Sequence, residues 1–267
     1  MLFIFALGLI VGSFLNVVIL RYNTGKSVGG RSACFSCGNG LKWHHLIPLV
    51  SFLALRGRCA FCRSKISWQY PLVELATALI FIKISSLHLS SSFPTALLTT
   101  HYSLLLILTL ISASLLVVIF VYDLRHKIIP DGIVFGFIGV SFISLLLRHS
   151  DSLGYSGAII DFVSAMVIFL FFFSLWYFSK GTWMGLGDGK LALGIGMYLS
   201  WPANLSAIII AFWVGAVFGL LLIAYEHLSR KRNGHSMKSE LPFAPFMIIG
   251  FFVALFMPID LISLLIL

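Results

Sequence analysis

The sequence predicts an all-α membrane protein with about eight transmembrane helices and one small polar loop domain. The first observation behind this fold class is composition, because 60% of the 267 residues are hydrophobic and only 10% are charged. Ordinary soluble domains have about 45–50% apolar and about 25% charged residues. The second observation is the length of the apolar runs, several of which approach the ~20 residues that a helix needs to cross a bilayer. A water-soluble globule is therefore excluded.

Eight apolar runs are the candidate spans, at 1–20, 71–88, 99–122, 132–147, 157–178, 191–201, 203–225 and 242–266. The first run has no basic residue before it and no small-residue cleavage pattern after it, so we expect a retained span and not a signal peptide. Run 191–201 is short for a full crossing. Leaving it out, however, would reverse the side of every later loop, so we keep it. The glycine pairs Gly8/Gly12 and Gly215/Gly219 have the spacing that lets helices approach closely.

Positive charges predict the side of the membrane that each loop faces. Sixteen of the eighteen Lys and Arg residues fall in four segments, 21–70, 123–131, 179–190 and 226–241, and the other two are Lys83 and Arg148. Basic residues beside apolar spans mark the cytoplasmic side. We therefore expect these four segments inside and the N-terminus outside. The lipid bilayer is the expected partner of these charges, and no nucleic acid is expected because the charges adjoin spans.

This pattern divides the chain into a first span (1–20), a cytoplasmic loop domain (21–70) and a helical core (71–267). All four cysteines lie in the loop domain, as Cys34-x-x-Cys37 and Cys59-x-x-Cys62 with 21 residues between the pairs. Two such pairs at about this separation can close a tetrahedral Cys₄ zinc site. Four thiolates leave no open position for water, so we predict a structural zinc ion whose binding stabilises the loop.

Alternatives to zinc remain open at this point. A reducing cytoplasm argues against two disulfides, but a redox dithiol and unligated thiols are possible. His44 and His45 could replace a cysteine as ligands, although solvated loop histidines are the simpler interpretation.

Two of the nine acidic residues stand out by position. Asp123 follows the charge-free run 99–122, and Asp188 comes just before run 191–201. Two crossings separate them, so both are expected at the same face, and an ionisable group at a span is a functional hypothesis by default. A carboxylate at a helix C-terminus faces the negative end of the helix dipole, so Asp123 is not explained as a cap.

Asp188 precedes a predicted helix and could be a plain N-cap. Gly185, Gly187 and Gly189 argue for more, because three glycines around one acid permit backbone conformations and close approach that a cap does not require. Asp131, by contrast, is interpreted as the cap of the helix that follows it.

Two carboxyl groups brought together in a low-dielectric site share a proton, so that one acts as base toward water and the other as acid toward a carbonyl. This is aspartic peptidase chemistry. We expect the helix N-terminus and Lys190 to lower the pKa of Asp188, which would make Asp188 the predominant base.

Several longer motifs cover nearly the whole chain. They are G-S-F-L-N-V-V-I-L-R at Gly12–Arg21, the paired C-x-x-C loop, L-R-G-R-C at Leu55–Cys59, Y-P-L-V-E-L at Tyr70–Leu75, D-L-R-H-K-I-I-P-D at Asp123–Asp131 and G-L-G-D-G-K-L at Gly185–Leu191. With these motifs the chain resembles the type IV prepilin peptidases, the bacterial leader peptidases of pilus and type II secretion systems. It departs from many relatives at Phe35, where they have Pro, and at Gly189, where they have Val; neither change affects a proposed ligand or acid.

The resemblance implies a bacterial inner-membrane aspartic endopeptidase that acts at the cytoplasmic face on prepilin or pseudopilin helices. Asp123 and Asp188 would be the catalytic pair, and the four cysteines would hold zinc. The enzyme would remove a short basic leader after Gly, usually before Phe, and would then N-methylate the new terminus with S-adenosylmethionine. No dinucleotide-type glycine motif is present, so the residues that bind the methyl donor are unknown.

Three further groups are expected to support the active site. Gly185, Gly187 and Gly189 would shape it together with Lys190, and Glu74 matches an acid of the family. Glu74 either orients substrate or is simply a favourable carboxylate near a helix N-terminus.

Two rival functions are retained. One is a peptidase without methyltransferase activity. The other is a zinc-stapled transporter that uses the two aspartates as ion ligands. The second is disfavoured because both aspartates lie at loop–span junctions, and because Asp161 and Asp260 are lone acids toward the outer side.

Overall fold

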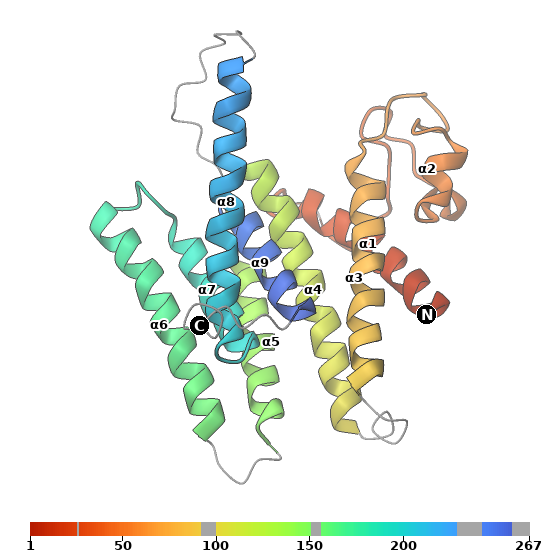
Figure 1. The fold of residues 1–267 in the computed structure, drawn as a ribbon. Helices are drawn as coiled ribbons and strands as arrows, with labels where there is room; N and C mark the ends of the chain where they lie inside the picture. Colours follow the sequence, from red (N-terminus) through yellow and green to blue (C-terminus); the bar gives the residue numbers. More distant parts are fainter. Residues whose placement is uncertain (26, 92–99, 151–155, 229–241, 258–267) are drawn as a thin grey trace. The chain divides into compact units, whose positions relative to one another are not determined.

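Helices make up the regular structure of this protein (Figure 1). The computed structural model describes residues 1–25, 27–91, 100–150, 156–228 and 242–257, in which no strand occurs. The helices are α1 (Leu2–Arg21), η1 (Trp43–Leu46), α2 (Val50–Ala54), α3 (Gln69–Ser91), α4 (Thr100–His126), α5 (Asp131–Arg148), α6 (Ser156–Ser179), α7 (Leu186–Tyr198), α8 (Ala203–Leu228) and α9 (Ala244–Phe256). The short helix η1 is a 3₁₀-helix.

The prediction of a polytopic all-α membrane protein is confirmed. Six described helices, α1, α3, α4, α5, α6 and α8, are long and apolar enough to span a membrane. Each of the eight predicted runs contains a described helix, but α7 and α9 have only 13 residues. At 1.5 Å per residue they are about 20 Å long, shorter than the ~30 Å hydrocarbon layer. Residues 258–267 and the basic cluster within 229–241 lie outside the described residues.

The chain divides into two compact units, Met1–Val118 and Ile119–Leu267, and the boundary falls within α4. In the first unit α1 packs on α3 through the predicted glycine pair. A Cβ at Gly8 would lie 2.5 Å from Ala78 Cα, and a Cβ at Gly12 would lie 2.7 Å from Glu74 Cα. The two helices can therefore approach this closely only because both positions are glycine.

A buried asparagine joins the ends of α1 and α3. The Asn16 side chain is fully buried and donates through Nδ2 to the carbonyl oxygen of Tyr70, at 3.3 Å. Gln69 Nε2 in turn donates to Asn16 Oδ1, at 3.2 Å. Because α1 ends and α3 begins at this junction, the two ends of the intervening segment 22–68 are held side by side.

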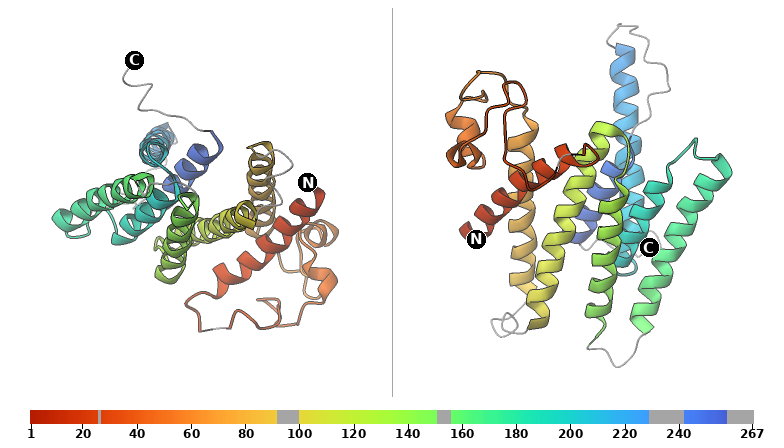
Figure 2. Two further views of the ribbon diagram at one scale, coloured as in Figure 1. Left: turned by 90° about the horizontal axis from the view of Figure 1, so that it is seen from below. Right: turned by 180° about the vertical axis from the view of Figure 1, so that it is seen from behind.

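The second unit is built around the short helix α7, which contacts both α5 and α6, while α8 packs on α9 (Figures 1 and 2). Leu191, Ala192 and Ile195 of α7 are fully buried. Close approach again depends on glycine, since a Cβ at Gly196 would lie 2.8 Å from Ala165 Cα on α6. By contrast, the predicted packing role of Gly219 is not supported, because a Cβ there would meet nothing within 4 Å.

A buried polar cluster closes the end of this unit where α5 finishes and α6 begins. Asp161 accepts from the backbone N–H of Trp201, at 2.9 Å, and its other oxygen lies 3.1 Å from His149 Nε2. Arg148 donates to the carbonyl oxygen of Met197, at 2.8 Å. These partners of Asp161 include no second carboxylate, which agrees with its interpretation as a lone acid, but they give it a structural role that was not expected. Asp260 lies outside the described residues.

Candidate active site and metal centre

The first candidate acid, Asp123, lies in the last turn of α4 and is 4% exposed. Its carboxylate accepts a hydrogen bond from the backbone N–H of Ala244, at the start of α9. The positive end of the α9 dipole thus faces this carboxylate. The C-terminal end of α4, where Asp123 lies, carries the negative end of its own dipole. No local sequence pattern predicts this donor, because it is a backbone group more than 100 residues away.

The second candidate acid, Asp188, is the third residue of α7 and not the residue before it. Gly185 is the N-cap of α7, and its backbone N–H donates to the Asp188 carboxylate. This contact is one half of a capping box, in which an acid at N3 bonds back to the N-cap. The interpretation of Asp188 as a simple N-cap is therefore corrected, because the helix begins five residues earlier than the apolar run.

The two carboxyl groups interact electrostatically. Burial raises the pKa of Asp188 to about 7, and repulsion from the Asp123 carboxylate acts in the same direction. The expected lowering of this pKa is wrong, because desolvation in the packed first turn of α7 outweighs the helix dipole. Two acids from α4 and α7, 65 positions apart in sequence, thus come close enough to influence each other's ionisation.

Lys190 does not pair with Asp188. Its Nζ donates to Asp131 Oδ1, at 2.7 Å, and lies 5.0 Å from the ring centre of Phe135. Asp131 is not the cap of α5 either, because Pro130 takes the N-cap position and Asp131 is the first helical residue. The ion pair connects the first turns of α5 and α7, so the charge of Lys190 is balanced by Asp131 and not by Asp188, two residues before it.

The three glycines around Asp188 differ in what they contribute. A Cβ at Gly187 would lie 3.0 Å from Ile129 Cβ, so this position requires close approach. A Cβ at Gly189 would make only ordinary contacts with Phe172 and Phe169. Gly185 has a φ of −77°, which any residue can adopt. The expected close approach is therefore met at Gly187, and none of the three glycines has a positive φ; their expected part in shaping the active site stays a prediction.

The four cysteines form a second constellation, in the first unit. They lie on two loops with the same hydrogen bonds. In the first, the backbone N–H of Cys34 donates to Asn39 O and that of Gly38 donates to Cys34 O. In the second, Cys59 N–H donates to Ser64 O and Arg63 N–H donates to Cys59 O. Gly38 and Arg63 occupy equivalent positions, and both have positive φ (70° and 59°).

The sulfur geometry of this cluster fits a tetrahedral metal ion. All four Sγ atoms lie within 4.8 Å of one another, and Cys34 Sγ is 3.8 Å from Cys62 Sγ. Four sulfurs at the usual Zn–S distance of about 2.3 Å would be about 3.8 Å apart. Backbone N–H groups of Cys37 and Ser36 lower the pKa of the Cys34 thiol to about 6, and the Ser64 side chain lowers that of Cys62. Both effects favour the thiolate form that ligates metal, whereas burial and the neighbouring thiols Cys34 and Cys62 raise the pKa of Cys37 to about 11.

Glu74 belongs to the first unit, in the second turn of α3, and is 6% exposed. Its Oε2 accepts a hydrogen bond from the backbone N–H of Leu49, at 2.8 Å. This long-range partner was not predicted. Glu74 lies in the first unit and the two aspartates lie in the second, so the expected support of the active site by Glu74 stays a prediction.

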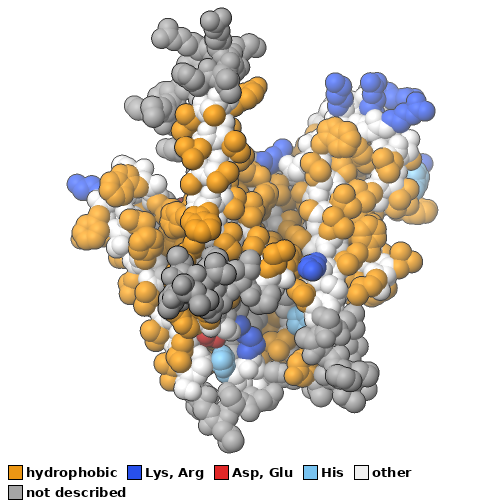
Figure 3. Space-filling model, viewed as in Figure 1, with side chains coloured by type: hydrophobic (Ala, Val, Ile, Leu, Met, Phe, Trp, Pro, Cys, Tyr) orange, Lys and Arg blue, Asp and Glu red, His pale blue; other side chains and the backbone are white. Residues whose placement is uncertain are grey.

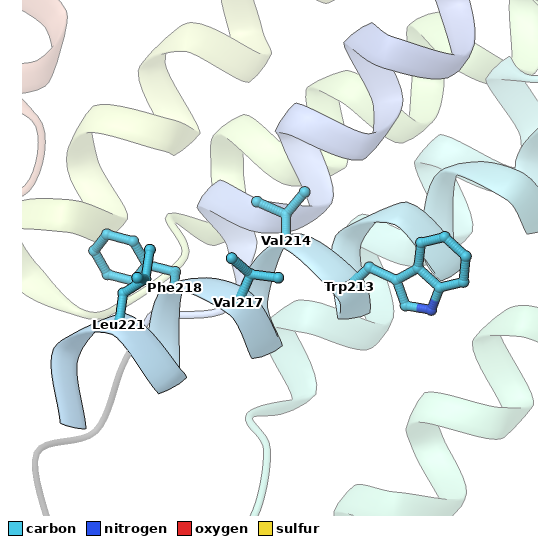
Figure 4. Close-up of a pocket in the computed structure, with 5 residues that line it drawn as sticks. All are labelled: Trp213, Val214, Val217, Phe218 and Leu221. Atoms are coloured by element: carbon cyan, nitrogen blue, oxygen red, sulfur yellow. The ribbon is translucent and has the colours of Figure 1, made fainter. Parts of the chain in front are cut away.

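One apolar depression lies on α8 (Figure 4), and no acidic residue is among the residues that line it. It has a volume of about 310 Å³, and Figure 4 shows its lining residues along one helix face. They are Trp213, Val214, Val217, Phe218 and Leu221. A surface of this kind on a membrane-spanning helix suits lipid chains or another apolar helix.

Comparison with known proteins assigns families to both units. The bacterial peptidase A24 N-terminal domain matches residues 6–87, and the type IV leader peptidase family matches residues 110–220. No solved structure matches the chain.

Curated relatives match most of the chain. A Myxococcus xanthus protein named prepilin leader peptidase/N-methyltransferase is 37% identical, over 83% of this chain and 62% of its own length. Relatives of the same name from Pseudomonas aeruginosa and Legionella pneumophila are 32% and 30% identical. Their alignments cover 93% and 85% of this chain, and 87% and 72% of the respective relatives.

Proposed function

Since the chain belongs to the type IV leader peptidase family, we propose that it is an aspartic endopeptidase that removes the leader from prepilins or pseudopilins. Asp123 and Asp188 are the proposed catalytic pair. The observation that carries this proposal is their electrostatic coupling inside the second unit, where burial and Asp123 together raise the pKa of Asp188 to about 7.

The chemistry follows from one proton shared between two carboxyl groups. Asp188 holds the proton near neutral pH and Asp123 is ionised. Asp123 accepts a proton from a water molecule as its oxygen attacks the scissile carbonyl carbon, and Asp188 donates its proton to the carbonyl oxygen. When the tetrahedral intermediate collapses, the C–N bond breaks and Asp123 gives its proton to the leaving amine. One hydroxyl of the intermediate returns a proton to Asp188 as the new carboxyl group forms. This assignment reverses the roles expected from the sequence.

The substrate we propose is an apolar helix with a short basic leader, cut after Gly at the cytoplasmic face. The enzyme's own loops are basic, so attraction to them cannot recruit a basic leader. Packing of the substrate helix against the spans is the proposed source of docking, and close packing of Gly187 on Ile129 is consistent with a narrow approach to Asp188. Replacing the substrate Gly by a bulky residue should therefore reduce cleavage much more than removing one leader Lys. The opposite ranking would contradict this docking mode.

We further propose that the four cysteines hold a structural zinc ion, supported by their spacing and sulfur geometry. A second reaction, N-methylation of the new terminus with S-adenosylmethionine as the methyl-donating substrate, is proposed because the curated relatives are named for both activities.

The test is cleavage of a purified prepilin by the purified full-length protein in detergent or lipid discs. Wild type should cleave and Asp123→Asn and Asp188→Asn should not, with losses of at least about 10³-fold, the range seen when a catalytic group is removed. Glu226→Gln is the control for loss of one acid, and it should cleave like wild type. Mass spectrometry of the product reports any added methyl group.

Two outcomes separate the rival functions. Cleavage without a methyl group, with donor present, identifies a peptidase that lacks the second activity. Cleavage that persists in both Asn variants would overturn the assignment of the catalytic pair.

A further inference from the structure

Two short helices of the 22–68 segment expose large apolar side chains. On η1, Trp43 is 78% exposed and Leu46 lies three residues on, which is the same face of a 3₁₀-helix. On α2, Val50 and Leu53 are 59% and 73% exposed and also share a face. η1 and α2 contact each other. We call these four side chains the apolar face of the loop. Such a surface on a water-facing segment indicates a contact partner.

The structure places this face beside the point where α3 enters its apolar span. The linker between η1 and α2 contains Leu49, whose N–H is held by Glu74 of α3 at 2.8 Å. Leu49 has φ 57° and ψ −47°, and Val50 N–H donates to Pro48 O in the same tight turn. Glu74 lies five residues after the start of α3, about 7 Å along the helix axis. The turn is therefore held at the second turn of a membrane-spanning helix.

A second contact keeps α2 at this level. The Phe52 ring on α2 lies 5.1 Å from the ring of Trp68, the residue just before α3 begins. In Figure 1, α2 lies next to the N-terminal end of α3. In the view of Figure 3, Lys and Arg side chains gather at the upper edge of this part of the molecule, and apolar side chains lie below them. The segment is thus amphipathic along the direction in which α3 runs.

Charge favours a lipid surface as the occupant. Residues 21–70 contain eight Lys and Arg residues and no Asp or Glu. No carboxylate has to leave water or approach anionic headgroups when this segment contacts a membrane, and its positive charge is attracted to such headgroups. Trp is also the residue most characteristic of the membrane–water boundary.

We propose that η1 and α2 lie in the headgroup layer of the same membrane that α1 and α3 span, with Trp43, Val50 and Leu53 inserted into it. The metal-binding loops would then face water, anchored to the bilayer by this face as well as by the flanking spans. The proposal depends on the membrane-spanning helices and not on the peptidase activity.

The experiment measures quenching of Trp43 fluorescence by brominated lipids, with the full-length protein in lipid discs that contain phosphatidylglycerol. The fluorescence of Trp43 is obtained by subtracting the fluorescence of the Trp43→Phe variant from that of wild type. We expect bromines near the headgroup to quench it at least twofold more than bromines near the chain ends. Trp213, 61% exposed on the spanning helix α8, is the control for lipid contact, isolated in the same way with Trp213→Phe.

Two results would overturn the proposal. One is a Trp43 signal that no brominated lipid quenches but that aqueous iodide quenches fully. The other is a signal shielded from iodide only after a prepilin is added, which would make the face a substrate-docking surface.

A pair of matched variants tests the apolar face itself. Leu53→Asp should reduce the lipid quenching of Trp43 at least twofold. Phe35→Asp should leave it unchanged, because Phe35 is equally exposed (75%) but lies in the first cysteine loop. Metal content measured on both variants shows that the loops are intact. Equal effects of the two substitutions would contradict the assignment of the contact to η1 and α2.

Discussion

The two candidate sites are held by different forces. In the segment from 22 to 68, Cys59 is the one hydrophobic residue that is fully buried among those described, and the cysteine loops are shaped by their own backbone hydrogen bonds. Around Asp188, by contrast, α7 buries Leu191 and Ile195 completely, and large side chains such as Phe137 and Phe172 fill the second unit. With the proposed zinc ion, the cysteine site would depend on a bound metal to be stable, whereas the site around Asp188 depends on close packing of helices.

Metal removal should separate the two regions most strongly. Chelation, or Cys59→Ser, should abolish protection of the backbone amides between Cys34 and Asn39 and between Cys59 and Ser64 from hydrogen exchange. Structural zinc supplies on the order of 10 kcal/mol to comparable sites, which the small core of this loop cannot replace. Amides of α7 should keep their protection. Loss of protection in α7 as well, or none in the cysteine loops, would show that the two regions do not differ in this way.

A glycine substitution in the second unit should destabilise that unit and leave the cysteine loops intact. A Cβ at Gly250 on α9 would overlap the carbonyl oxygen of Ala207 on α8, so Gly250→Ala should destabilise the second unit by about 1–3 kcal/mol, the usual range for overpacking. Thermal unfolding in detergent measures this effect. Gly219→Ala is the control, since its Cβ would meet nothing within 4 Å, and zinc content should not change in either variant. If both substitutions lower stability equally, packing at Gly250 is not responsible.

The smallest expected effect concerns the ion pair beside the active site. Asp131→Asn frees the ammonium of Lys190, which follows Asp188 by two residues, and an unbalanced positive charge on the same helix turn favours the ionised form of Asp188. The alkaline limb of the pH–cleavage profile should then move to lower pH, by roughly 0.5–1 unit. Lys190→Gln should move it upward and by less, because the Asp131 carboxylate left behind is 65% exposed and is screened by water. Shifts in the same direction in both variants would contradict the role given to this pair.

The sequence reveals different amounts about the two regions for a physical reason. The cysteine site was predictable because each C-x-x-C pair is one local loop, and two such loops need only meet. The six long helices were predictable because apolar length dictates them, whereas the run that contains α7 was kept only because its omission would reverse the side of every later loop. For Asp123 and Asp188, the sequence predicts only that both lie at the same face of the membrane, because two crossings separate them.

The local surroundings of the aspartates were not predictable. The start of α7 at Leu186 was missed because Gly187, Asp188 and Gly189 are poor helix formers in isolation, and packing on α5 and α6 overrides that preference. The Ala244 donor, the Asp131–Lys190 pair and the Glu74–Leu49 hydrogen bond all join segments distant in the chain. No local pattern encodes such contacts.

The most direct test of the central claim is infrared titration of the protonated carboxyl stretch in membrane-reconstituted protein. One band should titrate with a midpoint near pH 7 in wild type, because burial and Asp123 raise the pKa of Asp188 to about 7. Asp188→Asn should remove this band, and Asp123→Asn should move its midpoint to lower pH because the repulsion is gone. A band that both variants leave unchanged, or that is absent from wild type, would contradict the claim that these two acids share a proton.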